Sequence, residues 1–209
     1  MIRKPSRLKL STCSSVTTAL RYPRVAALSK EPLEAFLADV AAGTPAPGGG
    51  SSAAVAAGLA AALVEMAARL AASDRAVEQA GGLRARALRL ADDEMTSYAP
   101  VLEARDEHER ELALAAASEP PTHIAEAAAE VAELGMEVAA SSSPSVRGDA
   151  LTGVVLAEAA ASAAFRLVEI NVGSGPVFER ARAAELRAVR ARATATGRPP
   201  PSPHAPIPR

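Results

Sequence analysis

The sequence is poor in aromatic residues and in cysteine. Five of its 209 residues are aromatic, none is tryptophan, and Cys13 is the single cysteine. A lone cysteine excludes a disulfide framework and a cysteine-based metal site within one chain. Sandwiches, barrels and doubly wound sheets need runs of β-branched and aromatic residues. The low aromatic content therefore argues against each of these folds.

Histidine is also scarce and scattered. The three histidines are His108, His123 and His204, and none lies within five residues of another. Zinc and di-iron centres usually draw ligands from positions that are only a few residues apart. The sequence therefore predicts no metal site.

Long hydrophobic runs are missing as well. The longest apolar stretch, from Ala53 to Val64, is too short and too rich in alanine to span a bilayer. The beginning of the chain has no apolar region of the kind found in secretory signals. We therefore expect a cytoplasmic protein that has no membrane partner.

The net charge of −1 hides an uneven distribution of charged residues. Residues 1–28 carry six Lys or Arg and no acid, whereas residues 29–197 carry 15 basic and 24 acidic residues, a net charge of −9. An acidic body repels phosphate backbones, so we expect no nucleic-acid partner. The basic segment is interpreted as a disordered extension or as translation from an upstream start codon. Binding of an anionic partner is the alternative.

Alanine makes up about a quarter of the chain. It is the best helix former and is depleted in strands. We therefore predict an all-α bundle of five to six helices with a core of small residues. The helix predicted over residues 51–72 is apolar on nearly all sides as far as Glu65, so it is expected at the centre. So much apolar surface in a small domain predicts a homodimer.

The boundaries of the helices are predicted from caps, glycines and prolines. Ser29 is a candidate N-cap of the first helix, and Gly82 and Asp149 are expected to start the third and fifth helices. The tail from Arg198 has six prolines in twelve residues, which is typical of an extended, solvated segment. The chain is therefore divided into a basic, disordered extension (1–28), a helical domain (29–196) and a Pro-rich, disordered tail (197–209).

The most informative segment is the loop Pro45-Ala-Pro-Gly-Gly-Gly-Ser51, which leads into the central helix. Glycine leaves the backbone uncovered and adopts positive φ, so Gly49 or Gly50 is expected in a conformation closed to other residues. Free N–H groups at the start of a helix favour an anion. The loop either binds a ligand or lets two helices cross closely, with the serine as a plain cap. As a substrate-binding loop it comprises Pro47, Gly48, Gly49, Gly50 and Ser51.

Three further polar residues are candidates for a functional site. Glu94 shares a helix face with Leu90 and Tyr98, so its carboxylate is expected to be half-buried and suited to acid–base catalysis. A solvated helix face is the alternative. Asp149 stands at a predicted helix start, where it either caps the helix or orients a substrate. Asn171 ends an apolar helix, where its amide either caps the helix or binds a ligand.

Taken together, these segments resemble the cyclodeaminase/cyclohydrolase family. The glycine loop and the Leu63-Val-Glu-Met66 segment after it are similar to the family signature, and the resemblance runs from Ser29 to Asn171. The family includes the cyclodeaminase domain of formiminotransferase-cyclodeaminase and bacterial methenyltetrahydrofolate cyclohydrolases. The resemblance implies an all-helical homodimer that acts on a tetrahydrofolate derivative without a metal or redox cofactor.

Several positions depart from the family pattern by the change or loss of a polar side chain. The departures are Glu94 in place of Asp, Ser143 and Ser145 in place of Asn, Gly148 in place of Ser, and Leu167 in place of Asn. Asp149 and Asn171 are retained. The resemblance implies that Glu94 and Asp149 serve in proton transfer and substrate orientation. The alternative is a divergent, catalytically silent helical dimer that binds or scaffolds a partner.

The resemblance implies one of two reactions. A cyclodeaminase closes 5-formiminotetrahydrofolate to methenyltetrahydrofolate and releases ammonia, whereas a cyclohydrolase opens methenyltetrahydrofolate with water. Both reactions pass through a tetrahedral carbon and need proton transfer, to which a positioned carboxylate contributes about 10²–10⁴-fold. The anionic glutamate tail of folate is expected to meet an Arg or a helix N-terminus. An enzyme that acts on a different small molecule is the remaining possibility.

Overall fold

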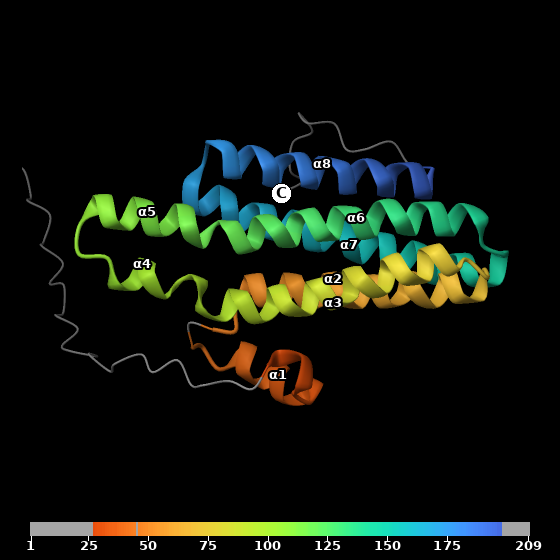
Figure 1. Cartoon of the computed structure of the whole chain (residues 1–209), viewed down its shortest axis with the longest axis horizontal. Coiled ribbons are helices and arrows are strands. Elements are labelled where there is room, and N and C mark those ends of the chain that lie inside the picture. Colours follow the sequence, from red (N-terminus) through yellow and green to blue (C-terminus); the bar gives the residue numbers. More distant parts are fainter. Residues whose placement is uncertain (1–26, 45, 198–209) are drawn as a thin grey trace, which may run out of the picture.

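The fold is a bundle of α-helices in which five long helices predominate (Figure 1). The computed structural model describes residues 27–44 and 46–197, and this part of the chain contains no strand. The predicted all-α class is therefore confirmed. The elements are, in order, η1 (Leu28–Lys30, a 3-10 helix), α1 (Leu33–Ala41), α2 (Gly49–Leu70), α3 (Asp74–Ser97), α4 (Ala99–Glu103), α5 (Glu107–Ala117), α6 (Glu119–Ser141), α7 (Pro144–Val172) and α8 (Pro176–Thr196).

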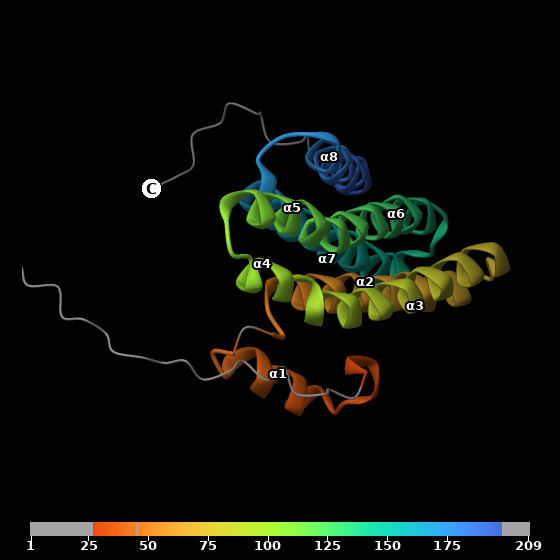
Figure 2. The same cartoon turned by 60° about the vertical axis from the view of Figure 1, so that its left-hand side comes forward.

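The long helices α2, α3, α6 and α7 pack side by side, and α8 covers α6 and α7 on one side (Figures 1 and 2). Short turns join α2 to α3 and α6 to α7, so each of these pairs is antiparallel. Helix α2 packs against α3, α6 and α7. The predicted central position of the alanine-rich helix is therefore confirmed. Helix α1 lies beside α2 and α3, away from α8 (Figure 2).

The core is built mainly from alanine. Of the 40 hydrophobic residues that are buried in the described part of the chain, 27 are alanine. Because a methyl side chain is short, helix backbones that face each other through alanine approach closely. The core is therefore filled by closely spaced helix backbones rather than by large side chains.

The closest approach of three helices surrounds Val64 of α2. A β-carbon at Gly135 of α6 would lie 2.9 Å from Val64 Cγ2 and 2.8 Å from Val154 Cγ2. A β-carbon at Gly153 of α7 would lie 2.9 Å from Val64 Cγ2 and 3.0 Å from the carbonyl oxygen of Ala60. Both positions therefore need glycine, because the neighbouring helices already fill the space that a side chain would occupy.

A row of glutamates along α6 forms ion pairs with the helices on either side of it. Toward α3, Glu130 Oε1 and Glu137 Oε2 each lie 2.9 Å from an arginine nitrogen. Toward α8, Glu126 and Glu133 pair with arginines as well. Exposed ion pairs of this kind contribute at most about 1 kcal/mol each. Glutamates that pair with α3 alternate along α6 with glutamates that pair with α8. The ion pairs therefore align both α3 and α8 along α6.

Glu65 is a buried acid in the second half of α2. Its carboxylate accepts hydrogen bonds from Arg84 of α3 and from Arg69, one turn further along α2. The two guanidinium groups, Arg84 foremost, hold the pKa of Glu65 below its ordinary value despite the opposing effect of burial. The acid therefore stays ionised, and its pairing with Arg69 has the i, i+4 spacing at which helix side chains meet.

The predicted start of the third helix is wrong. Helix α3 begins at Asp74 rather than at Gly82, and two glycines lie within it. Ala76 and Ala80 are buried against the bundle, and Gly81 lies beside the Glu65 side chain. Tertiary packing therefore maintains the helix across a pair of residues that lower its intrinsic propensity.

The N-terminal boundary also differs from the prediction. Ser29 belongs to η1, and the N-cap of α1 is Pro32, so Ser29 does not cap this helix. Leu28 is buried, and its backbone N–H donates a hydrogen bond to Asp92 Oδ1 at 2.7 Å. The remainder of the predicted extension (residues 1–26) and of the predicted tail (residues 198–209) lies outside the described residues.

Helices α2 and α7 are long and apolar enough to cross a membrane by length and composition alone. The uninterrupted apolar stretch from Ala53 to Val64 is shorter than a membrane span, but the apolar window of α2 extends beyond it. Half of the apolar window of α2 and 44 % of that of α7 are buried inside the bundle. Both are core helices, and a core position accounts for helices that are apolar on most sides.

Candidate functional site

The glycine loop, Glu94 and Asn171 meet at one end of the bundle. Helix α2 begins there, and α3 and α7 end there, so segments far apart in the sequence lie close together (Figure 1). They enclose a cavity of about 150 Å³. The residues that line it are Ala46, Gly48, Gly49, Gly50, Ser51, Glu94, Met95, Ser97, Tyr98, Ala117, Pro121, Leu167 and Asn171. Pro47 is buried beside this lining.

The glycine loop forms the N-terminal end of α2. Gly48 is the N-cap residue, and its carbonyl accepts hydrogen bonds from the Ser52 N–H (3.0 Å) and the Ser52 hydroxyl (2.8 Å). The N–H groups of the first helical turn have no carbonyl partner within the helix. The positive end of the helix dipole is at the same place. This side of the cavity therefore favours a carboxylate or developing negative charge.

The glycines are needed for a reason that differs from the prediction. None of Gly48, Gly49 and Gly50 has a positive φ, so the expected conformation closed to other residues is wrong. A β-carbon at Gly50 would overlap the carboxyl group of Glu94. A β-carbon at Gly49 would meet Leu167 Cδ2 at 3.5 Å, an ordinary contact. Gly50 is therefore the glycine on which the position of the carboxylate depends.

Glu94 lies near the end of α3 with its side chain half-buried, as its helix face predicted. Its Oε2 accepts a hydrogen bond from Ser97 Oγ at 3.0 Å. Burial raises the pKa of Glu94 above its ordinary value, and the hydrogen bond from Ser97 opposes part of this rise. A raised pKa makes the ionised carboxyl group a stronger proton acceptor, as acid–base catalysis requires.

Ser51 uses its hydroxyl to hold α2 against α3. The side chain is buried, and Oγ donates a hydrogen bond to the Ala91 carbonyl at 3.3 Å. It also lies 3.7 Å from Met95 Sδ. Because Ala91 and Met95 flank Glu94 on α3, this contact fixes the turn that carries the carboxylate.

The opposite wall of the cavity comes from the last turns of α7. Leu167 and Asn171 line it one helical turn apart, and Leu167 is the residue that replaces a polar one of the family pattern. Tyr98, which follows α3, lines the cavity with a side chain that is partly exposed. The cavity therefore combines apolar walls, an amide and an aromatic ring around one carboxylate.

Asp149 lies at the other end of the bundle. Helix α7 begins at Pro144, so Asp149 lies in its second turn, and the prediction that it starts a helix is wrong. The error has a physical cause: proline fits the first position of a helix, and Gly148 is accommodated within α7. Asp149 and Leu167 are separated along α7 by about 27 Å at 1.5 Å per residue. Asp149 and Glu94 of one chain therefore do not share the cavity.

Sequence reasoning missed several residues of the lining. Ser97 is three residues after Glu94, a spacing at which helix side chains meet, so this partner was detectable. Met95, Ala117 and Pro121 reach the cavity only through the packing of α3, α5 and α6. No local pattern in the sequence marks these three residues.

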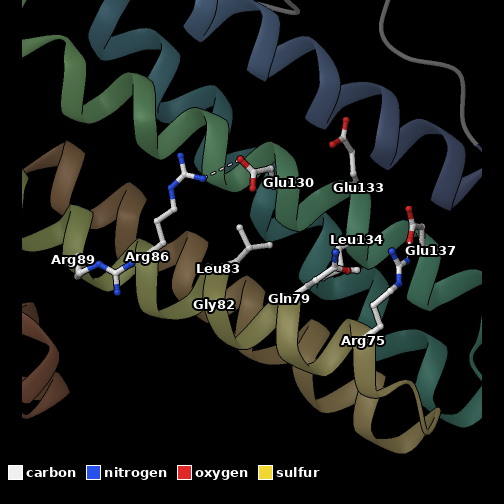
Figure 3. Close-up of a pocket in the computed structure, with 10 residues that line it drawn as sticks. All are labelled: Arg75, Gln79, Gly82, Leu83, Arg86, Arg89, Glu130, Glu133, Leu134 and Glu137. Atoms are coloured by element: carbon white, nitrogen blue, oxygen red, sulfur yellow. Dashed lines mark hydrogen bonds and ion pairs between the residues drawn. The ribbon is translucent and has the colours of Figure 1, made fainter.

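A larger groove of about 490 Å³ lies between α3 and α6 (Figure 3). Arg86 and Arg75 of α3 extend toward Glu130 and Glu137 of α6 and pair with them. None of the predicted site residues lines this groove. Since its charges are largely matched within the bundle, we assign the candidate functional site to the cavity beside Gly50.

The chemistry that the cavity offers is proton transfer and hydrogen bonding. Glu94 is the one carboxylate among the lining residues, and no Lys, Arg or His is among them. In the ranges 27–44 and 46–197, no three His, Cys, Asp or Glu side chains are grouped as they are in a metal site. The groups able to act on a ligand are therefore the carboxyl group, the N–H groups at the start of α2, and the Asn171 amide.

Comparison with known proteins identifies the family and a similar fold. Residues 32–190 match the family model described as formiminotransferase-cyclodeaminase. Among solved structures, the fold is similar to that of formiminotetrahydrofolate cyclodeaminase from Thermotoga maritima, with a TM-score of 0.75 and 22 % identity over 81 % of this chain and 96 % of that chain. Comparison with curated proteins gave no match. The matched range includes the glycine loop, Glu94 and Asn171.

Proposed function

Because the chain belongs to the formiminotransferase-cyclodeaminase family, we propose that it is a cytoplasmic enzyme of folate one-carbon chemistry. In the proposed reaction, 5-formiminotetrahydrofolate is closed to methenyltetrahydrofolate and ammonia is released, without a metal or redox cofactor. The observation that carries the proposal is the half-buried carboxyl group of Glu94, which rests against Gly50 inside the cavity.

The proposed reaction moves one proton. N10 attacks the carbon of the protonated formimino group and forms a tetrahedral carbon bonded to N5, N10 and the leaving nitrogen. N10 must then lose its proton, and the leaving nitrogen must gain one before its bond to carbon breaks. A single carboxylate suffices, because ionised Glu94 can accept the proton from N10 and donate it to the leaving nitrogen. Its raised pKa makes the carboxylate a stronger proton acceptor than that of an exposed glutamate.

The other lining residues hold the substrate. A cavity of about 150 Å³ is smaller than the roughly 300–1,000 Å³ of sites that enclose drug-sized ligands. It therefore receives the one-carbon edge of the folate, with the rings resting outside against Tyr98. In this proposal Pro47 shapes the loop, and the substrate is bound by Gly48, Gly49, Gly50, Ser51 and Asn171.

The absorbance of methenyltetrahydrofolate tests the proposal. With 5-formiminotetrahydrofolate, the purified protein should generate the methenyl chromophore and an equal amount of ammonia. With methenyltetrahydrofolate as substrate, a cyclohydrolase would bleach the chromophore instead, so the faster of the two changes identifies the reaction. No change with either substrate would contradict the proposal and favour the catalytically silent dimer.

Replacement of the acid tests its role. Glu94→Gln keeps the size of the side chain but cannot accept a proton, so kcat should fall by about 10²–10⁴-fold. The matched control is Asp93→Asn, which removes an exposed carboxylate from the neighbouring position. Turnover by Glu94→Gln equal to that of Asp93→Asn would remove Glu94 from the mechanism.

The proposed homodimer packs through the face that α2 and α7 present away from the core. Large apolar side chains stay exposed on both helices. They are Leu59, Met66 and Leu70 of α2 and Val155 and Ile170 of α7. Monomeric proteins seldom leave large apolar patches exposed, and a second copy packed on these two helices would cover the side chains. Light scattering that shows a stable monomer at micromolar concentration would contradict this packing.

A dimer of this kind also gives Asp149 a place at the site. A two-fold axis makes the same two positions meet twice, once in each direction. If the α7 helices pair antiparallel about their midpoint, near Glu158, Asp149 of the partner subunit comes beside Leu167. In this proposal each cavity takes Glu94 from one chain, while Asp149 of the partner subunit orients the substrate.

A further inference from the structure

The cavity beside Gly50 has an unusual charge content. Its lining, as far as the structure describes it, contains one acidic residue, Glu94, and no basic residue. Most of the other lining side chains are apolar or absent, from the glycines of the loop to Leu167 on α7. A carboxylate in such a place has lost water without gaining a cation from the protein.

Glu94 has one side-chain hydrogen bond and no cationic partner among the described residues. Ser97 donates to Oε2, and no arginine, lysine or histidine of the described chain contributes to the electrostatics of Glu94. The buried acid Glu65 differs, because it has two arginines. Since burial of an unpaired charge is unfavourable, the ionised form of Glu94 is completed best by a cation from outside the protein.

The space limits the kind of cation. At about 150 Å³ the cavity admits a fragment of a few heavy atoms. A carboxylate binds most strongly to a planar donor that offers two parallel N–H groups, as the guanidinium of arginine does. The smallest cation with this geometry is formamidinium, a planar N–C–N ion with hydrogen on both nitrogens. A bulky or spherical ammonium ion lacks this geometry.

We propose that the cavity is an amidinium site, in which the carboxylate of Glu94 pairs with the planar N–C–N cation of the ligand. The inference rests on the proposed function and extends it, because the protonated formimino group and the methenyl product both carry a planar N–C–N cation. The formimino group can donate N–H from its terminal nitrogen, whereas the methenyl cation has no N–H and pairs with the carboxylate by charge alone. The protein then recognises the one-carbon group of the ligand through its charge. A free amidinium ion, with no folate attached, is expected to bind and to compete with the substrate.

Formamidinium is the probe that tests this inference. Isothermal titration with formamidinium chloride should show saturable binding to the full chain, whereas formamide, its neutral counterpart, should not bind. Glu94→Gln should weaken formamidinium binding at least tenfold, and Asp93→Asn should leave it unchanged. Tetramethylammonium chloride at equal concentration controls for ionic strength and should give no saturable heat.

The pH dependence of binding provides a second readout. A cation binds the ionised acid, so affinity should fall as the pH drops through the pKa of free Glu94 and should be constant above it. Burial raises that pKa, so the loss begins at higher pH than for an exposed glutamate. Tyr98 is the other titratable lining residue. Tyr98→Phe should therefore leave the pH profile in place.

The outcomes separate this inference from the proposed function. Formamidinium binding that Glu94→Gln does not weaken, or no binding in a protein that converts 5-formiminotetrahydrofolate, would overturn the inference while the function stands. Glu94-dependent formamidinium binding in a protein that converts neither folate would support the inference and overturn the function. As a further measurement, Glu94→Gln should weaken binding of the methenyl cation more than binding of uncharged tetrahydrofolate. Equal weakening would overturn the inference.

Discussion

At the scale of single residues, the position of the Glu94 carboxyl group depends on Gly50. We expect Gly50→Ala to displace the carboxyl group, because the new β-carbon would occupy its place. A shift of about 1 Å at the reacting group typically costs on the order of 10² in rate. The measurement is kcat/KM for 5-formiminotetrahydrofolate, with the melting temperature followed in parallel.

Gly49→Ala is the matched control for this change. Its β-carbon would make only an ordinary contact with Leu167, so activity should stay within a few-fold of the wild type. The two variants differ by one position in the same loop. Equal loss of activity in both would show that the loop needs flexibility, not the space at Gly50.

The hydroxyl of Ser97 sets the pH at which Glu94 ionises. Its hydrogen bond lowers the pKa of Glu94, so Ser97→Ala should raise that pKa further. The acid limb of the kcat/KM profile, where activity is lost as Glu94 becomes protonated, should therefore move to higher pH. Thr96→Ala removes an exposed hydroxyl from the preceding residue and should leave the limb in place. An unmoved limb in Ser97→Ala would contradict this role.

Residue-scale features were predictable to different degrees. The half-buried position of Glu94 followed from helical periodicity, because Leu90 and Tyr98 share its face. The requirement at Gly50 did not follow, because it arises from a side chain on another helix and not from the backbone angles of the loop. The sequence indicated Glu94 as a candidate acid, whereas its contact with Gly50 depends on how α2 and α3 pack.

At the scale of the helices, replacing either of two glycines of α7 by alanine should change stability in opposite directions. A β-carbon at Gly153 would press on Val64 and on the Ala60 carbonyl, so Gly153→Ala should destabilise the fold by about 1–3 kcal/mol. Gly148 lies in the same helix with open space around it. Gly148→Ala should therefore stabilise the fold by about 0.5–1 kcal/mol, the usual difference between the two residues in a helix.

Chemical denaturation measures both effects on one scale. The midpoints of the two variants should move in opposite directions, with similar dependence of unfolding free energy on denaturant. A Gly153→Ala variant as stable as the wild type would mean that α2 and α7 separate at little cost. That outcome would contradict the close approach around Val64.

The helix boundaries show where sequence patterns fail. The helix starts predicted at Gly82 and Asp149 are wrong. Gly82 and Gly148 both lie inside long helices, because contacts with the rest of the bundle outweigh the low helix propensity of glycine. Conversely, the turn at Gly43 and the end of α7 near Gly173 do have glycines with positive φ. Composition alone does not separate these two uses of glycine.

At the scale of the whole molecule, the proposed pairing of two chains predicts subunit complementation. Glu94→Gln and Asp149→Asn should each inactivate the homodimer. In a mixed dimer, one cavity carries both changes and the other carries neither. Reassociation of the two inactive variants in equal amounts should therefore restore roughly a quarter of wild-type activity, since half of the dimers are mixed and one of their two sites is intact.

The same experiment has a clear contrary result. If Asp149 acts within its own chain or only stabilises α7, mixing restores nothing beyond the activity of the separate variants. Mixing Glu94→Gln with the wild type controls for loss of activity during dissociation and reassociation. Restored activity in the mixed sample alone would place residues of two chains in one site.

The predominance of alanine in the core has a consequence for the entropy of folding. Burial of a side chain normally fixes rotamers at a cost of up to about 2 kcal/mol, but alanine has none to fix. With 27 alanines among the 40 buried hydrophobic residues, this chain orders its interior with little loss of side-chain freedom. The native state is thus favoured by the small loss of side-chain entropy in its interior, as well as by the apolar surface that it buries.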